Sequence, residues 1–383
     1  MAMVSRTRSF NTLKPRGYVR WHSETSTPDM VETRNTCVDT VLSGDCHPFN
    51  VEYTKTWGGE MTALGTGGSS AKCIDYVIDA FTRNISQWQA VATGGPSNSV
   101  VAAEAAARTN PSRPYVDVPA FLFELGDIAL LVRDTLSKGI MMAGAMNNLR
   151  YQFGIAPMVG DLAKLLEFND QVERRVAVIK KLNGPRGYRR TIDFGRFSGS
   201  GMSASTQVQS NPNTYSQSYF RRTSVGIKVH CRWKAAHHPE FLASDQAIRS
   251  LAKRAVLGMG RGIPFYGRGV LSRDTLISLY EAMPWSWLID WCSNLGDYLS
   301  TFRNVIPAQL TTLCVMRDWQ NHCELARRTG MMTSTVPFVT NQGTYIHGKK
   351  SRDPVVLTPA AHFPFLSGSQ MSILTSLAIL RSR

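Results

Sequence analysis

The sequence has little negative charge and no long apolar run. It carries 28 Asp and Glu against 43 Lys and Arg, which leaves a formal net charge of +15 at pH 7. No apolar stretch reaches the length of a membrane span, and the first residues lack the apolar run of a secretory signal. We therefore expect a polyanionic partner, nucleic acid before an acidic membrane surface.

Cysteine pairs of the metal-binding or redox type are also missing. The seven cysteines are odd in number and form no C-x-x-C pair. This usage is typical of reduced, buried thiols in a protein made in a cytosol.

The usual catalytic and cofactor motifs are absent as well. GTGGSSAK at 65–72 lacks the glycine before its lysine and the Ser or Thr after it, so it does not match a phosphate-binding loop. No G-x-S-x-G occurs, and FSGSGMS at 197–203 is more typical of a turn. His230-Cys231 and His237-His238 lack metal-site spacing. We expect no catalytic residue, no metal and no cofactor.

With 43% hydrophobic residues the chain can bury a sizeable core. Turn-rich stretches with short β-like runs cover 1–70, 184–222 and 330–370. The clearest strand is 223–234, where apolar and polar residues alternate. That period of two predicts one buried face and one wet, basic face.

Helical spacing dominates the middle of the chain. The Ala-rich segment 98–109 should end at Asn110-Pro111. Further helices are predicted at 119–149, 157–182, 239–257 and 371–381, the last with Ile373, Leu377 and Leu380 aligned. In the helix at 157–182 an apolar stripe of Leu162, Leu165, Val172, Val176 and Ile179 lies opposite Glu167, Asp170, Arg174 and Lys181.

These textures predict an α+β fold with a helical bundle region and a mostly antiparallel β-sheet region, elongated and discontinuous in sequence. In chain order we expect a β-rich region at 1–97, a helical region at 98–182, a β-rich insertion at 183–235, a helical region with a basic loop at 236–304, a β-rich region at 305–370 and a C-terminal helix at 371–383.

Two basic clusters point to RNA. One surrounds Tyr188, and the other runs into the glycine-rich GMGRGIPFYGRG at 258–269. Arg beside aromatic residues in flexible backbone suits splayed bases and phosphates, although a solvated surface would look similar. The RNA-binding candidates, chosen from charge, are Lys180, Lys181, Arg186, Arg189, Arg190, Arg249, Lys253, Arg254, Arg261, Arg268 and Arg273.

A third basic face is carried by the strand at 223–234. Lys228, His230, Arg232 and Lys234 share its polar side. The ordinary wet side of a sheet explains this pattern somewhat better than a binding patch does.

Three of the eight tryptophans stand in AMPWSWLIDWCSN at 282–294, with Asp290 among them. A helical wheel over 284–303 places Trp287, Trp291, Leu295, Tyr298 and Phe302, with Leu288 and Leu299, on one arc. Ser286, Asp290, Ser293, Asn294, Asp297 and Thr301 fall on the other arc. We expect an amphipathic helix with a buried aromatic seam and Asp290 in a structural or partner-facing role rather than a catalytic one.

Four segments resemble, in order and spacing, the maturation proteins of single-stranded RNA bacteriophages. They are NPSRPYVDVPAFLFEL at 110–125, YQFGIAPMVGDLAKLL at 151–166, MPWSWLIDW at 283–291 and a terminal LAILRSR. The resemblance covers the helical half directly and the β segments only in texture. Phe153, within the second segment, joins Trp287 and Trp291 as a predicted core residue.

The resemblance implies one copy per virion, in place of a coat-protein dimer, made in the host bacterial cytoplasm. The helical part would bind the 3′ region of the genomic RNA, and the β part would face outward to a bacterial pilus. The protein would then enter the host with the RNA, and some family members also inhibit cell-wall synthesis.

Two other functions stay open. One is a hydrolase or nuclease that uses Asp290 with a nearby histidine. The other is a non-viral RNA-binding protein with no role in a capsid.

Overall fold

The computed structural model describes the chain in discontinuous ranges. These are 4–12, 18–21, 24–26, 33–41, 46–58, 60–65, 70–73, 91–117, 164, 166–202, 206–210, 213–217, 219–236, 244–259, 277, 289–290, 293–331, 336–359, 373 and 375–376. The predicted helix at 119–149 lies outside them, as do Phe153, Trp287, Trp291, Arg261, Arg268 and Arg273.

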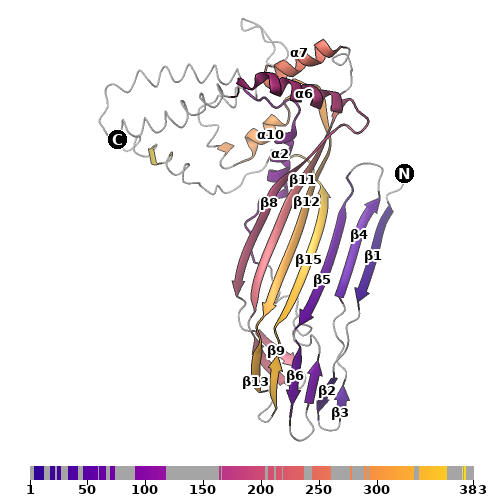
Figure 1. Ribbon diagram of the computed structural model, residues 1–383, viewed down its shortest axis with the longest axis vertical. Helices are drawn as coiled ribbons and strands as arrows, with labels where there is room; N and C mark the ends of the chain where they lie inside the picture. Colours follow the sequence, from indigo (N-terminus) through magenta and orange to yellow (C-terminus); the bar gives the residue numbers. More distant parts are fainter. Residues whose placement is uncertain are drawn as a thin grey trace. The chain divides into compact units, whose positions relative to one another are not determined.

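The fold is α+β, as predicted, and its largest element is a seven-stranded sheet of order β1-β4-β5-β15-β12-β11-β8 (Figure 1). Its strands are β1 (Val4–Thr12), β4 (Thr33–Val41), β5 (Phe49–Gly58), β8 (Tyr188–Met202), β11 (Phe220–Ala235), β12 (Ala308–Leu325) and β15 (Gly343–Pro354). Neighbours β1 and β4, β4 and β5, β5 and β15, and β15 and β12 all pair antiparallel.

Two smaller sheets accompany it. One has six strands in the order β13-β14-β6-β7-β2-β3 and the other pairs β10 with β9. Their bounds are β2 (Tyr18–Trp21), β3 (Glu24–Ser26), β6 (Met61–Leu64), β7 (Ser70–Cys73), β9 (Thr206–Ser210), β10 (Asn213–Gln217), β13 (Arg328–Met331) and β14 (Pro337–Thr340).

Strand β11 confirms the predicted alternation. Val225, Ile227, Val229, Cys231 and Trp233 are buried. Lys228 and Lys234, on the other side of the strand, are exposed. Burial of the apolar side chains of β11 is favourable, and a shift of one residue would turn them toward water. Burial therefore fixes the register of this strand.

The chain divides into two compact units, each assembled from separate segments. Unit 1 contains 1–97, 192–229 and 314–354, and unit 2 contains 98–191, 230–313 and 355–383. Strands β8, β11 and β12 contribute residues to both units.

The described helices belong to unit 2: α2 (Asn98–Thr109), α6 (Phe168–Leu182), α7 (Asp245–Val256) and α10 (Leu295–Ser300). Helix α6 packs on α7 and α10 on α2. A larger bundle stays a prediction. Within the described residues, no helix is long and apolar enough to cross a membrane.

Helix α2 has the predicted bounds. Helix α6 begins at Phe168, later than the predicted residue 157, and shows the C-terminal part of the predicted stripe; Leu162 and Leu165 lie outside the described residues. Val172, Val176 and Ile179 are buried, whereas Glu167, Asp170, Arg174 and Lys181 are exposed. Helix α7 begins later than the predicted residue 239. Ser244 is extended, and its side chain accepts a hydrogen bond from the Ala247 N–H, so it caps a helix that starts at Asp245.

A buried polar network ties the end of α2 to the segment that follows α10. The Asn110 amide donates to the carbonyls of Ser300, Thr301 and Arg303 at 3.0, 3.0 and 3.1 Å. The Ser112 hydroxyl donates to the Ile306 carbonyl at 3.1 Å and accepts from the Ile306 N–H at 2.9 Å. Because buried polar groups are costly when unpaired, these bonds specify how the two segments meet.

The single helix predicted over 284–303 is wrong. Residues 289–290 are helical, Ser293 and Asn294 are not, and α10 starts afresh at Leu295. The wheel therefore fails: Asn294 and Thr301, from its polar arc, are buried, and Phe302, from its aromatic arc, is 37% exposed. A break in the helix changes the face on which each later residue falls.

The prediction of reduced cysteines is wrong for one pair. Cys46 and Cys314 form a disulfide between residues 268 apart in sequence. No sequence spacing revealed this pair, because the sheet alone brings the two residues together. Cys231 and Cys323 are free and buried, and burial raises the pKa of their thiols to about 11 and about 12. Such thiols stay protonated and unreactive.

Of the predicted C-terminal helix, Ile373, Thr375 and Ser376 lie within the described residues and are helical. Ile373 is buried, as expected for the aligned apolar side.

Candidate nucleic-acid interface

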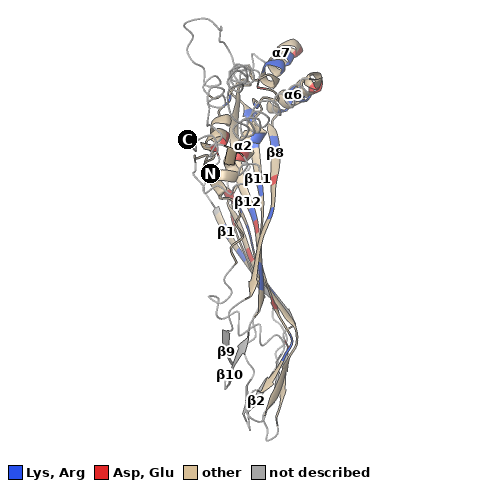
Figure 2. Cartoon of the chain, turned by 90° about the vertical axis from the view of Figure 1, so that its left-hand side faces the viewer, with Lys and Arg blue, Asp and Glu red and all other residues tan. Residues whose placement is uncertain are grey.

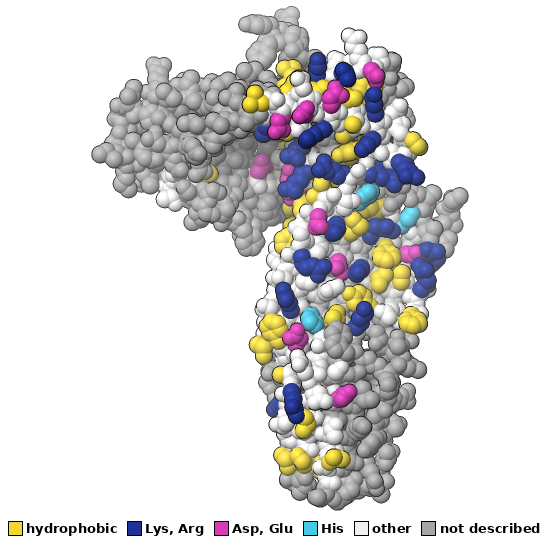
Figure 3. Space-filling view, viewed as in Figure 1, with side chains coloured by type: hydrophobic (Ala, Val, Ile, Leu, Met, Phe, Trp, Pro, Cys, Tyr) yellow, Lys and Arg dark blue, Asp and Glu magenta, His cyan; other side chains and the backbone are white. Residues whose placement is uncertain are grey.

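The first basic cluster lies where α6 ends and β8 begins. Lys180, Lys181, Arg186, Arg189 and Arg190 are all exposed. In Figure 3, Lys and Arg side chains gather over this part of the surface. The cluster is therefore open to solvent and to a ligand.

The turn between α6 and β8 holds a fixed position. Gly187 has a φ of 66°, and a Cβ there would lie 2.4 Å from the carbonyl oxygen of Trp233. Arg232 also donates from Nε to the Arg186 carbonyl at 2.8 Å and from Nη2 to the Pro185 carbonyl at 3.1 Å. Only glycine fits this left-handed position against a neighbouring strand, so the turn carries its arginines on a rigid base.

The second cluster lies on α7. Arg249 and Lys253 are exposed one turn apart, and Arg254 is half-buried. The apolar side of α7, which includes Ile248, Leu251 and Ala255, is buried. This leaves the charged side of the helix in water, as its amphipathic pattern requires.

Packing of α6 on α7 brings members of the two clusters together (Figure 2). We define the α6–α7 groove as the hollow of about 650 Å³ between them, lined by Glu173, Val176, Lys180, Asp245, Gln246, Arg249, Ser250 and Lys253. Lys180 pairs with Asp245 at 3.0 Å and Arg249 with Glu173 at 3.3 Å. Both pairs are largely exposed, so they contribute little stability and can exchange for other anions.

The strand face of Lys228, His230, Arg232 and Lys234 is largely occupied by contacts within the protein. Lys228 lies 3.2 Å from Asp193, and His230 Nδ1 lies 3.0 Å from the Thr191 hydroxyl. Arg232 holds the turn described above. The structural explanation of this face is therefore favoured.

Sequence reasoning missed a third concentration of charge. The cationic pocket, as we call it, is a hollow of about 490 Å³ in unit 2 with six Lys and Arg and two tyrosines in its lining. Its described charged and aromatic members are Arg108, Arg113, Lys164, Arg174, Arg175, Arg190, Tyr115 and Tyr188, and no acidic residue is among the lining residues that the structure describes. Only Arg190 was among the predicted candidates. The adjacent pair Arg174-Arg175 and the arginine of NPSRP were the available signals.

Arg175 is the half-buried cation of the described lining, whereas the other five cations are exposed. Its guanidinium donates to the Pro111 carbonyl, and at 2.7 Å to the Arg113 carbonyl. Burial lowers the pKa of Arg175 to about 10, with a further lowering from the charge of Arg113. The group stays protonated at neutral pH, so a positive charge is held in a poorly hydrated place.

Tyr115 is fixed at the edge of the same pocket. Its hydroxyl donates to Glu167 Oε2 at 2.8 Å, and Gln171 donates to the same oxygen at 3.4 Å. The bond from Tyr115 is the main reason that the pKa of Glu167 lies below its ordinary value. Glu167 therefore stays ionised and holds the ring in place.

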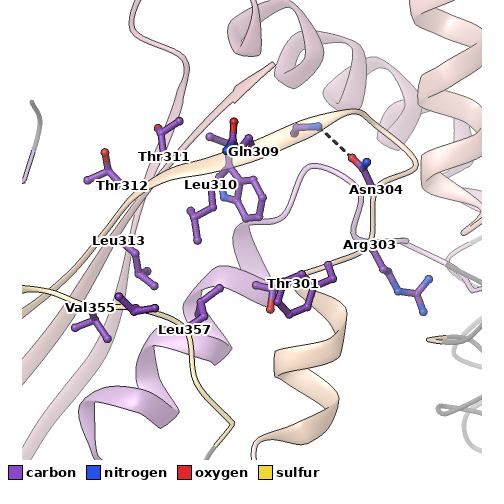
Figure 4. A pocket seen from close by; sticks show the side chains of 14 residues that line it. Thr301, Arg303, Asn304, Gln309, Leu310, Thr311, Thr312, Leu313, Val355 and Leu357 are labelled. Atoms are coloured by element: carbon purple, nitrogen blue, oxygen red, sulfur yellow. Dashed lines mark hydrogen bonds between the residues drawn. The ribbon is translucent and has the colours of Figure 1, made fainter. Parts of the chain in front are cut away.

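A more apolar hollow of about 550 Å³ offers no such chemistry (Figure 4). Leu310, Leu313, Val355 and Leu357 line it with several threonines, and Arg303 is the one charged residue among its described lining. The Arg303 side chain points away from the leucines, and its guanidinium lies 2.6 Å from Asp117. We assign this hollow no reaction.

Asp290 has a structural contact. Its exposed carboxylate accepts a hydrogen bond from the Gly296 N–H at 2.8 Å, in the first turn of α10. That is a favourable place for a negative charge. Across the described ranges, no group of three or more His, Cys, Asp or Glu side chains is placed to hold a metal ion.

No protein-family model matches this chain, and no curated protein matches it either.

Proposed function

We propose that the protein is a structural RNA-binding component of a single-stranded RNA phage particle, of the maturation-protein kind. In this proposal unit 2 binds the 3′ region of the genomic RNA. The protein takes the place of a coat-protein dimer in the shell, and its β-rich part attaches the particle to a bacterial pilus for RNA entry.

The observation that carries the RNA-binding part is the α6–α7 groove. Lys180 and Arg249, which are 69 positions apart in the chain, line one hollow together with Lys253. Phosphates take up such cations readily, because releasing the counterions of the nucleic acid favours binding. The four segments quoted above support the virion part of the proposal.

The experiment is RNA binding by the full chain over a range of salt concentrations. Replacing Lys180, Arg249 and Lys253 with Gln removes up to three phosphate contacts. The slope of log affinity against log salt should then fall by about 2 to 3, because each contact contributes ~0.7–0.9. The matched control replaces Lys349 and Lys350, two exposed cations of β15 in unit 1, and should leave the slope unchanged.

A salt-independent affinity of the unaltered protein for RNA would contradict the proposal. A genomic neighbourhood without coat and replicase genes, on a DNA genome, would favour a non-viral RNA-binding protein. A turnover of nucleic acid or ester that Asp290→Asn abolishes in a folded protein would favour the hydrolase or nuclease alternative.

A further inference from the structure

We propose that the cationic pocket binds a single unstacked nucleotide of single-stranded RNA, with arginines on its phosphate and a tyrosine ring against its base. The inference rests on the proposed function and adds to it a defined subsite in unit 2. The α6–α7 groove would meet phosphates alone.

The charge of the cationic pocket points to an anion. Its described lining contains six cations and no carboxylate, and the described acidic groups that interact with these cations include Glu104, Glu167 and Asp297. Arg108 pairs with Glu104. Among the described residues, positive charge therefore exceeds negative charge in the lining of the hollow.

Three of its arginines are available to a ligand. Arg113 comes from the loop after α2, Arg174 from α6 and Arg190 from β8, and all three are exposed. Within the described part of the chain, no hydrogen bond or ion pair engages their guanidinium groups. Guanidinium groups from three segments that converge on one hollow suit a phosphate, which accepts bidentate hydrogen bonds on several sides.

Arg175 strengthens the case for an anion. Its guanidinium donates hydrogen bonds to the Pro111 and Arg113 carbonyls and so fixes the loop that carries Arg113. Its charge stays in a poorly hydrated position, as the lowered pKa indicates. A phosphate in the hollow would offset that cost, because a nearby opposite charge favours the ionised form.

The two tyrosines and the size of the hollow indicate a base as well as a phosphate. Tyr115 and Tyr188 are both half-buried in the lining, so each ring presents one part to the hollow. The volume of about 490 Å³ falls in the range of small-ligand sites, roughly 300–1,000 Å³. Bases that leave the stack bind to proteins by lying on aromatic rings and arginine planes.

An RNA duplex would fit this hollow poorly. Its bases are stacked inside the helix, and only its backbone and a shallow groove are accessible. An anionic lipid surface would meet the exposed arginines but would have no use for the two rings. A single-stranded loop or tail is therefore the favoured ligand.

The test measures binding of the full chain to a short oligouridylate and to a blunt RNA duplex of equal length. Replacing Arg174 and Arg190 with Gln should lower the affinity for the oligouridylate about tenfold and reduce its salt slope by about 1.4. Tyr188→Leu should weaken binding about tenfold by removing the stacking surface, and Tyr188→Phe should bind like the unaltered protein. Duplex binding should change little in both tyrosine variants. Thermal unfolding checks that each variant is folded.

The failures of the two proposals are distinguishable. If the groove variant loses RNA binding while the Arg174 and Arg190 variant does not, the subsite is overturned and the RNA-binding function stands. If Tyr188→Leu binds as well as Tyr188→Phe, or inorganic phosphate competes as well as uridine monophosphate, the pocket is an anion site without base contact and the proposal fails. Binding to phosphatidylserine vesicles that depends on the same arginines, without oligouridylate binding, would overturn it in favour of a membrane surface.

Discussion

Two described arginines of unit 1, Arg6 and Arg196, differ in their surroundings from the arginines that line the cationic pocket in unit 2. On the sheet of unit 1, Arg6 lies 2.5 Å from Asp39, and Arg196 lies 2.9 Å from Asp318. In the pocket, six described cations line one hollow with no carboxylate among the described lining, and Arg108 pairs with Glu104 beside it.

This difference separates two uses of positive charge. Arg6 and Asp39 lie opposite each other on the neighbouring strands β1 and β4, where opposite charges support strand pairing. Arg196 of β8 reaches Asp318 of β12 across the strand between them, β11. Like charges brought into one hollow oppose folding unless another group compensates them. The net charge of the chain does not distinguish structural ion pairs from a cluster of cations. The neighbours of each charged group distinguish them.

The largest effect is expected from the hydrogen bonds of Asn110, which hold the end of α2 beside the pocket, rather than from the charges of the pocket. Asn110→Ala removes a donor from the buried carbonyls of Thr301 and Arg303 and from the part-buried Ser300 carbonyl, which keeps the Arg303 N–H at 3.3 Å. We expect a loss of about 3 kcal/mol in the free energy of unfolding, measured by urea denaturation. Asn304→Ala, which removes one exposed acceptor of the Ala308 N–H, should cost no more than about 1 kcal/mol. Equal losses of unfolding free energy in the two variants would show that the Asn110 network does not stabilise the contact between α2 and the residues around 300–303.

Arg175→Met tests the pocket arginine that donates to the loop after α2. It removes charge-assisted hydrogen bonds to the Pro111 and Arg113 carbonyls while keeping most of the apolar stem. We expect a loss of about 2 kcal/mol in the free energy of unfolding and weaker oligouridylate binding in the same variant. Denaturation and binding assays on one preparation check both, and a variant of unaltered stability would contradict the role of Arg175 in holding the loop after α2.

Arg113→Gln and Arg196→Gln form a matched pair across the two regions. Arg196 pairs with Asp318 and donates to the Ser224 hydroxyl at 3.1 Å, so its loss should cost about 0.5 kcal/mol. The charge of Arg113 opposes that of Arg175, so its loss should leave stability unchanged or slightly raised. Urea titrations of the two variants measure the change in the free energy of unfolding. A loss for Arg196→Gln with no loss for Arg113→Gln would support the comparison, and equal losses would contradict it.

The smallest effect is expected in the acid dependence of unit 1. The hydrogen bond from Arg6 is the main cause that holds the pKa of Asp39 below its ordinary value. Because the folded pKa is depressed, the stabilisation is present above the pKa of the unfolded chain and is lost as the pH falls through the folded value. Arg6→Gln should therefore lower the unfolding midpoint slightly at pH 7 and not at all in strong acid. A difference that persists in strong acid would point to lost packing instead.

Local patterns in the sequence predicted local structure well. Helix α2, the buried stripe of α6 and the alternation of β11 follow from spacings within about a dozen residues. At each of these places the residues that need burial are neighbours on one helix face or one strand face. The α+β class follows from the same signals.

What the sequence could not predict depends on distant segments. The cationic pocket combines the end of α2, one side of α6 and the start of β8, and only their packing makes one hollow of them. The Cys46–Cys314 disulfide and the break between Ile289 and Leu295 depend likewise on partners outside any short window. The RNA-binding candidates at Arg261, Arg268 and Arg273 remain a prediction, since they lie outside the described residues.

The Asn110 network also sets a time at which unit 2 can be completed during synthesis. Its three acceptors follow Asn110 by 190, 191 and 193 residues. At roughly 5–20 residues per second, a ribosome needs roughly 10–40 s to add that length. During that interval the end of α2 is already synthesised, but the residues that accept hydrogen bonds from Asn110 are not. The cationic pocket can therefore be completed only after the later segment has been made.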